Sequence, residues 1–235
     1  MIKTILFDLD GTLLPMNQDI FVKAYFKSLA EIFINNHLDR PNLIETVIAG
    51  TNRMVENNGE KFNEEVFWVE YDKAFRKETL RDKSLIDLYY ENDFDKLKQV
   101  CGFNPETRSV IEELKRQGYQ LILATNPVFP MLAQEKRVEW AGLNKEDFKY
   151  ITSYENSHYC KPNPKYYEEI LNKLELNPKE CIMVGNDTTE DAAAKTLGMD
   201  FFLLTNCLLN KERKDISQYP RGSFMQLLDY IEKIS

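Results

Sequence analysis

The second half of the chain alternates short apolar runs with amphipathic segments, a pattern typical of strands separated by helices. From about residue 104, helical patterns end at glycines such as Gly118, and apolar runs follow them. Strands are expected at residues 119–125, 150–154, 181–185 and 200–205, and helices at residues 105–118, 131–142, 164–176, 189–198 and 223–234. This alternation predicts right-handed crossovers between mainly parallel strands.

One more strand is expected at the start of the chain. Residues 2–8 form a β-branched and apolar run, and a lone strand could not satisfy its backbone, so it must join the same sheet. Residues 15–100 show helical spacing and no strand signal. We therefore expect an α/β fold, with a Rossmann-like, mainly parallel sheet sandwiched by helices and an inserted all-helical domain. The predicted domains are a core of residues 1–14 and 101–235 and a helical domain of residues 15–100.

Apolar residues within the insert recur at helical spacing. One face of its first helix carries Phe21, Ala24, Tyr25, Leu29, Ile32 and Phe33. A later helix is expected at residues 63–80, and we interpret its aromatic residues as packing core rather than as a binding site. These aromatic residues are Phe67, Trp68, Tyr71 and Phe75.

Composition and charge exclude several classes of protein. The formal net charge of −8 argues against a broad nucleic-acid interface and against binding to an anionic membrane. No apolar stretch approaches the ~20 residues that span a bilayer, and the N-terminus lacks the features of a secretory signal. The four cysteines form no C-x-x-C pair, which argues against a structural zinc site and fits reduced thiols. We expect a cytoplasmic protein.

Polar residues cluster where the predicted strands end. Ligands of open α/β sheets bind outside the carboxyl ends of the strands, so these residues should meet at one edge. They are Asp8, Asp10, Thr125, Asn126, Lys161, Asn186, Asp187 and Asp191. Carboxylates, amides, a hydroxyl and an ammonium together suit a hard cation with oxygen ligands and a phosphoryl group. Mg²⁺ is the expected ion.

The spacing of Asp8 and Asp10 places both carboxylates on one side of an extended chain. One of them can then attack a reacting centre while the other donates or accepts a proton there. Lys161 would neutralise negative charge on the nucleophile and on the transferring group.

Four short stretches together resemble the motifs of the haloacid dehalogenase superfamily. They are DLDGT at 8–12, LATN at 123–126, KPNP at 161–164 and VGNDTTED at 184–191. Their order and their places at strand ends match the family, and the resemblance extends over the whole chain. It implies a Mg²⁺-dependent phosphatase for a small phosphorylated metabolite, in which the helical insert is a C1-type cap that closes over the site.

The resemblance also implies a role for each matching residue. Asp8 corresponds to the nucleophile that forms an aspartyl-phosphate, and Asp10 to the general acid and base. Thr125 and the backbone of Asn126 correspond to groups that bind the phosphoryl oxygens, and Lys161 to the lysine of the third motif. Asp8, the carbonyl of Asp10 and an acid of the fourth motif would hold Mg²⁺.

The fourth motif departs from the family pattern. Many members have Gly-Asp where this chain has Gly185-Asn186-Asp187. Either Asn186 contacts the metal ion through its amide oxygen, or Asp187 contacts it through its carboxylate and Asp191 lies behind Asp187. The spacing of Asp187 and Asp191 favours the second alternative.

Asp10 favours cleavage of a phosphate ester, because relatives that cleave carbon–halogen bonds or phosphonates lack an acid at this position.

Within the insert, AGTNR at 49–53 resembles a G-x-x-R segment of phosphosugar mutases, so Arg53 would reach a second anionic group of the substrate. The alternative for Arg53 is a solvated helix face. Two other functions stay open, a phosphosugar mutase or phosphotransferase and a non-catalytic phospholigand-binding protein. The sequence names neither the substrate nor the oligomeric state.

Overall fold

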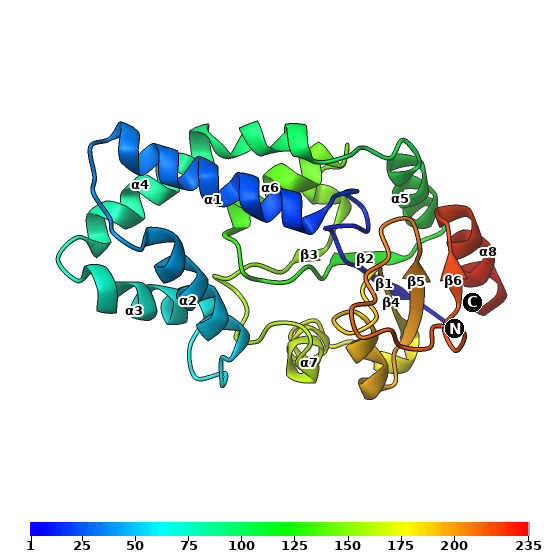
Figure 1. Ribbon diagram of the computed structural model, residues 1–235. Coiled ribbons are helices and arrows are strands. Elements are labelled where there is room, and N and C mark those ends of the chain that lie inside the picture. Colours follow the sequence, from blue (N-terminus) through cyan, green and yellow to red (C-terminus); the bar gives the residue numbers. More distant parts are fainter. Residues whose placement is uncertain (235) are drawn as a thin grey trace.

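A sheet of six parallel strands forms the centre of the computed structural model, which describes residues 1–234 (Figure 1). The strands are β1 (Thr4–Phe7), β2 (Gln120–Leu123), β3 (Tyr150–Ile151), β4 (Cys181–Gly185), β5 (Asp200–Leu204) and β6 (Arg221–Gly222). Their order across the sheet is β3-β2-β1-β4-β5-β6. The expected Rossmann-like α/β fold is confirmed, and the N-terminal strand joins the sheet between β2 and β4.

The register of the central strands aligns their carboxyl ends. Phe7 of β1 pairs with Leu123 of β2 and with Val184 of β4. Directly after the strand, the backbone N–H of Asp8 donates to the carbonyl of Val184 at 2.9 Å. The segments that follow β1, β2 and β4 therefore emerge side by side at one edge of the sheet.

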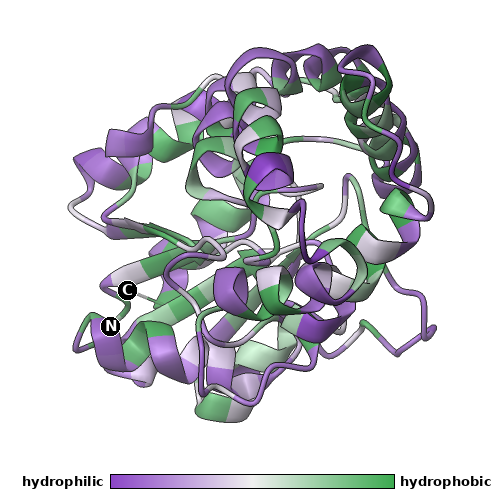
Figure 2. Cartoon of the chain, turned by 90° about the vertical axis from the view of Figure 1, so that its left-hand side faces the viewer, coloured by the Kyte–Doolittle hydropathy of each residue, from purple (hydrophilic) through white to green (hydrophobic). Residues whose placement is uncertain are grey.

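Helices cover both faces of the sheet. Helices α5 (Glu106–Arg116) and α8 (Phe224–Ile234) pack on the face to which Phe7 points, whereas α7 (Pro164–Lys173) packs on the opposite face with Leu6. Because alternate residues of a strand point to opposite faces, β1 is apolar and buried on both sides. Figure 2 shows strands that are largely hydrophobic and helices that carry both hydrophobic and hydrophilic residues.

Two expected elements differ from the sequence pattern. The helix expected at residues 189–198 is a short 3₁₀ helix, η4 (Ala192–Leu197), because the residues before it form a turn around the carboxylate of Asp187. The strand expected at residues 150–154 ends at Ile151. The short strand β6 carries no sequence signal and was not expected.

Between β1 and α5, the described residues form helices and no strand. These are α1 (Gln18–Asn35), α2 (Leu43–Val55), α3 (Asn63–Phe75), α4 (Thr79–Asn92) and the 3₁₀ helix η1 (Phe94–Val100). The helix expected at residues 63–80 is divided, because the chain turns back so that the Tyr71 hydroxyl donates to the Asp82 carboxylate at 2.9 Å. None of the helices in residues 1–234 has both the length and the apolar character of a membrane-spanning segment.

Residues 18–100, here called the helical segment, leave the sheet and return to it at one place. The N–H of Gly102 donates to the carbonyl of Pro15 at 2.7 Å beside an isolated bridge between Met16 and Cys101. The segment also packs on α6 (Met131–Trp140), where the Phe94 and Trp140 rings stack with centroids 5.1 Å apart. One hydrophobic cluster extends from the helical segment to the sheet. The division into two domains at residues 14 and 101 stays a prediction.

Candidate active site

Asp8 follows β1 directly, and its carboxylate lies almost completely inside the protein. One carboxylate oxygen accepts a hydrogen bond from Lys161 Nζ at 2.8 Å, and the other accepts from Thr12 Oγ1 at 3.1 Å. A buried carboxylate is costly unless it is paired and hydrogen-bonded, and these contacts supply both conditions. They also hold the side chain in one orientation.

Lys161 bridges two carboxylates from different parts of the chain. Its Nζ lies 2.8 Å from Asp8 Oδ1 and 2.7 Å from Asp191 Oδ1, and the lysine is 1% exposed. Burial alone would lower the pKa of Lys161, but the Asp191 and Asp8 carboxylates outweigh burial and raise this pKa well above its usual value. Lys161 is therefore a permanently protonated cation beside Asp8. In the other direction, burial raises the pKa of Asp191.

Asn186 enters the same network through Thr12. The Thr12 hydroxyl lies 3.0 Å from Asn186 Oδ1 as well as 3.1 Å from Asp8 Oδ2, and Asn186 Nδ2 donates to the Cys207 carbonyl at 2.7 Å. The turn needs glycine at position 11, where φ is +85° and an added Cβ would lie 2.4 Å from Asn186 Nδ2. The amide oxygen of Asn186 thus faces the Asp8 side of the site.

Asp187 faces away from Asp8 in its hydrogen bonding. Its Oδ1 accepts from the backbone N–H groups of Thr189 at 2.6 Å and Glu190 at 2.9 Å, so it stabilises the turn after β4. Its own N–H donates to Asp191 Oδ2 at 2.9 Å. The two adjacent residues therefore differ, since Asn186 contacts the Asp8 network and Asp187 holds the backbone.

Asp10 forms an ion pair with Arg137 of α6. Burial raises the pKa of Asp10, and the neighbouring guanidinium opposes this rise. Arg137 is completely buried, donates a second hydrogen bond to Gln134 Oε1, and lies with its Cζ 4.5 Å from the centroid of the Phe129 ring. The sequence analysis missed this residue. An arginine on the apolar face of the helix expected at 131–142 was the available signal.

Thr125 and Asn126 follow β2 and lie at the same edge as Asp8. Thr125 is buried, and its carbonyl accepts from Thr152 Oγ1 at 2.7 Å and from the Tyr166 hydroxyl at 2.9 Å. Asn126 Nδ2 donates to Glu190 Oε2 at 3.2 Å. Burial raises the pKa of Glu190 to about 7. The loop after β2 is thus fixed to the protein on two sides.

Asn63, at the start of α3, ties the helical segment to the loops around the site. Its fully buried Nδ2 lies 3.3 Å from the Pro127 carbonyl and 3.3 Å from Cys160 Sγ, and its Oδ1 accepts from Asn57 Nδ2 at 2.9 Å. Pro127 follows Asn126, and Cys160 precedes Lys161. Sequence reasoning gave no signal for this contact.

Arg53 does not enter this network. Its side chain is 55% exposed on α2 and forms ion pairs with Glu56 at 3.0 Å and Glu70 at 3.7 Å. These contacts correspond to the solvated helix face that was the alternative in the sequence analysis.

The predicted metal ligands divide into two groups. The described residues contain no group of three or more His, Cys, Asp or Glu side chains placed to hold a metal ion. Asp187 accepts from backbone N–H groups of the turn after β4 and Asp191 contacts Lys161, whereas Asp8 and Asn186 both present an oxygen atom to the Thr12 hydroxyl. Asp10 Oδ1 is buried without a hydrogen-bond partner. In their chemistry, the Asp8 carboxylate, the backbone carbonyl of Asp10 and the amide oxygen of Asn186 fit a hard cation whose remaining ligands are water and a phosphoryl oxygen.

Known proteins are similar to this chain over most or all of its length. A family model described as haloacid dehalogenase-like hydrolase matches residues 2–198. The glyceraldehyde 3-phosphate phosphatase of Methanothermobacter thermautotrophicus is 26% identical over 235 residues, which is 100% of this chain and 98% of that protein. The pyrophosphatase PpaX of Bacillus cereus is 22% identical over 237 residues, covering 99% of each chain.

Solved structures share the fold over nearly the full length. A predicted phosphoglycolate phosphatase from Haemophilus somnus superposes with a TM-score of 0.60 at 20% identity, covering 98% of each chain. A 2-haloacid dehalogenase from Pseudomonas syringae superposes with a TM-score of 0.67 at 19% identity, covering 100% of each chain. At these identities the likeness shows a common fold.

Proposed function

Because this chain belongs to the haloacid dehalogenase-like hydrolase family, we propose that it is a Mg²⁺-dependent phosphatase acting on a small phosphorylated metabolite. The observation that carries the proposal is the buried Asp8 carboxylate, held by Lys161 at 2.8 Å and by Thr12 at 3.1 Å, with Asp10 two residues further on. The names of the phosphatase and pyrophosphatase relatives support the same class of reaction.

The first step of the proposed reaction forms a covalent bond to Asp8. A carboxylate oxygen of Asp8 attacks the phosphorus, the bond from phosphorus to the ester oxygen breaks, and Asp10 gives its proton to the departing alkoxide. Lys161 stabilises the negative charge on the transferring group, and Thr125 and Asn126 bind its oxygens. The raised pKa of Asp10 suits this step because it favours the protonated acid.

The second step returns the enzyme to its starting state. Asp10, now ionised, takes a proton from water, and the resulting hydroxide attacks the phosphorus of the aspartyl-phosphate. The bond from phosphorus to the Asp8 oxygen breaks, and inorganic phosphate leaves. Arg137 stabilises the ionised form of Asp10 between the two steps.

The Asp8 carboxylate, the backbone carbonyl of Asp10 and the amide oxygen of Asn186 would hold Mg²⁺ in this proposal. When bound, the ion offsets the charge repulsion between the anionic nucleophile and the anionic substrate. The contact of Asn186 with Thr12 supports Asn186 over Asp187 as the ligand from the fourth motif, contrary to the alternative that the spacing of Asp187 and Asp191 favours.

Phosphate release from a broad panel of phosphomonoesters tests the function. With Mg²⁺, the purified protein should release phosphate, and Asp8→Asn should lower kcat by about three orders of magnitude or more. Asp19→Asn, which changes an exposed carboxylate of α1, is the matched control. Failure of the protein to hydrolyse any ester, with Asp8→Asn equal to the natural chain, would contradict the proposal.

The mutase alternative rests on Arg53, and the ion pairs of Arg53 with Glu56 and Glu70 give it no support. A mutase would produce an isomeric phosphosugar instead of free phosphate, which the same panel detects. A non-catalytic phospholigand-binding protein would be stabilised by its ligand without turnover. The cytoplasmic location expected from the sequence stays a prediction.

A further inference from the structure

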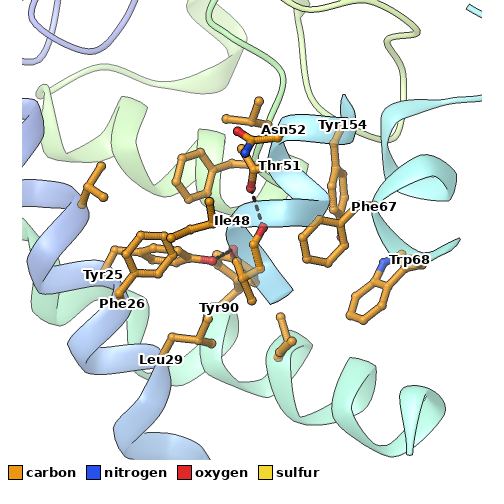
Figure 3. Close-up of a pocket in the computed structure, with 15 residues that line it drawn as sticks. Tyr25, Phe26, Leu29, Ile48, Thr51, Asn52, Phe67, Trp68, Tyr90 and Tyr154 are labelled. Carbon is orange, nitrogen blue, oxygen red and sulfur yellow. Dashed lines mark hydrogen bonds between the residues drawn. The ribbon is translucent and has the colours of Figure 1, made fainter. Parts of the chain in front are cut away.

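An apolar cavity of about 330 Å³ lies within the helical segment and against the loop after β2. Helices α1 to α4 form most of its wall (Figure 3), and Val128 and Phe129 of the loop after β2 also line it. Its volume is at the lower end of the range that holds small ligands. Phe67 and Trp68, expected to be packing core, line this cavity.

The cavity wall carries no charged residue among those the structure describes. Three of its hydroxyl groups are already paired, since the Tyr25 and Tyr90 hydroxyls lie 2.8 Å apart and the Thr51 hydroxyl donates to the Val47 carbonyl at 2.9 Å (Figure 3). A sugar with several hydroxyl groups would find few partners here, since the remaining polar groups of the wall are those of Asn52, Trp68 and Tyr154, and most of its hydrogen bonds to water would be lost. A second phosphate or a carboxylate would find no counter-charge.

The cavity is joined to the candidate active site by Phe129. Phe129 lines the cavity, and the centroid of its ring lies 4.5 Å from Cζ of Arg137, which is paired with Asp10. The same loop begins at the phosphoryl-binding residues, because the N–H of Val128 donates to the carbonyl of Asn126 at 2.9 Å. The loop therefore leads from the expected phosphoryl position to the cavity wall.

We propose that this cavity binds the alcohol part of the substrate, and that the chain acts on phosphomonoesters of apolar alcohols with an alkyl chain or an aromatic ring. This inference rests on the proposed phosphatase function and deepens it. It separates this chain from the small polar substrates that the names of its relatives indicate, which are glyceraldehyde 3-phosphate and pyrophosphate.

A series of n-alkyl phosphates from methyl to hexyl, with glycerol 3-phosphate for comparison, tests the substrate class. Each methylene that enters an apolar cavity should raise kcat/KM about fourfold until the cavity is full. A flat series would overturn the proposal, as would a higher kcat/KM for glycerol 3-phosphate than for hexyl phosphate.

Filling the cavity tests the location. Thr51→Trp introduces a large side chain into the wall and should lower the ratio of kcat/KM for hexyl phosphate to that for methyl phosphate about tenfold or more. Val55→Trp places the same side chain on the same helix, at an exposed position outside the wall, and should leave the ratio unchanged. An equal ratio in both variants would place the alcohol elsewhere.

Binding without turnover separates this inference from the proposed function. In a Trp140→Phe background, Trp68 is the sole tryptophan, and its emission should change with hexylphosphonate but not with methylphosphonate. If no ester is hydrolysed while hexylphosphonate still changes the emission, the phosphatase proposal fails and the cavity remains an apolar ligand site. If polar esters are hydrolysed and neither probe changes the emission, the cavity proposal alone is overturned.

Discussion

The guanidinium of Arg137 donates a hydrogen bond to the carboxylate of Asp10, although the two residues are 127 positions apart in the chain. Arg137 is fully buried, whereas the Asp10 side chain stays 21% exposed. The ion pair links Asp10, the expected general acid and base, to helix α6. Through the contact of Arg137 with Phe129, it also links Asp10 to the wall of the cavity. Asp10 thus has a fixed position and a fixed counter-charge.

Replacing Arg137 with methionine should lower kcat by about ten- to a hundredfold, because Asp10 loses its orientation. The pKa of Asp10 should rise further, so the pH profile of kcat/KM should move to higher pH. Arg137→Lys should recover part of both effects. Arg116→Met, at an exposed position on α5, is the control. If kcat and the pH profile are unchanged in Arg137→Met, Arg137 has only a structural role.

Exchanges at the fourth motif should distinguish Asn186 from Asp187. Asn186→Asp places a carboxylate beside Thr12 and should lower the Mg²⁺ concentration for half-maximal activity about tenfold. Asp187→Asn should leave that concentration unchanged and reduce the free energy of unfolding by about 1 kcal/mol, because it weakens the turn. Activity titrated with Mg²⁺ and urea unfolding give the two readouts. The opposite result would assign the metal to Asp187.

Lys161→Met should abolish activity and destabilise the folded protein in a pH-dependent way. The buried Asp8 and Asp191 carboxylates would lose their counter-charge, at a cost of about 3–5 kcal/mol near neutral pH. Protonation of Asp191, whose pKa burial already raises, should relieve part of this cost at about pH 5. Urea unfolding at about pH 5 and pH 8 measures the difference. Adding Asp191→Asn should restore stability at the higher pH, and an equal loss at both pH values would count against the bridge.

Glu190 should make the metal-free protein less stable as the pH rises. Its pKa is raised from 4.5 to about 7, so the folded state binds a proton that the unfolded state has released between these values. The free energy of unfolding therefore has its full value below about pH 4.5. It falls by about 2–3 kcal/mol as the pH rises past 7. Glu190→Gln should flatten the dependence and be more stable than the natural chain at about pH 8.

Urea unfolding with chelator present, across that pH range, provides the measurement for Glu190. Glu232→Gln, at an exposed position on α8, is the matched control and should follow the natural chain. Parallel curves for Glu190→Gln and the natural chain would show that Glu190 titrates normally.

The strand pattern places most of the candidate site residues at one edge of the sheet, because the carboxyl ends of parallel strands meet there. Once β1 was placed beside β2 and β4, Asp8, Thr125 and Asn186 had to lie close together. The directions in which adjacent side chains of a turn point cannot be predicted in this way. Neither alternation nor spacing tells which of Asn186 and Asp187 faces Asp8, because the local backbone turn decides it.

The contacts that could not be predicted from the sequence depend on tertiary packing. Arg137 is a charged residue within a helix, and nothing near it in the chain indicates the partner 127 residues away. Asn63 acts between two loops that only the folded chain brings together. Arg53 is a different case, since the G-x-x-R pattern fits many helix surfaces and here lies on an exposed one, which was one of its two alternatives.

The hydrogen bond between Gly102 and Pro15 has a consequence for how this family can diversify. Because the chain departs and returns at neighbouring residues, the intervening sequence can lengthen, shorten or be exchanged without altering the strand order. Under the proposed function, exchange of this segment would change which alcohol is accepted while Asp8, Asp10 and Lys161 stay in place. A graft that joins a relative's insert at these two positions should transfer substrate preference, provided that it keeps the contacts of Asn63 with Pro127 and Cys160 and the stacking of Phe94 on Trp140.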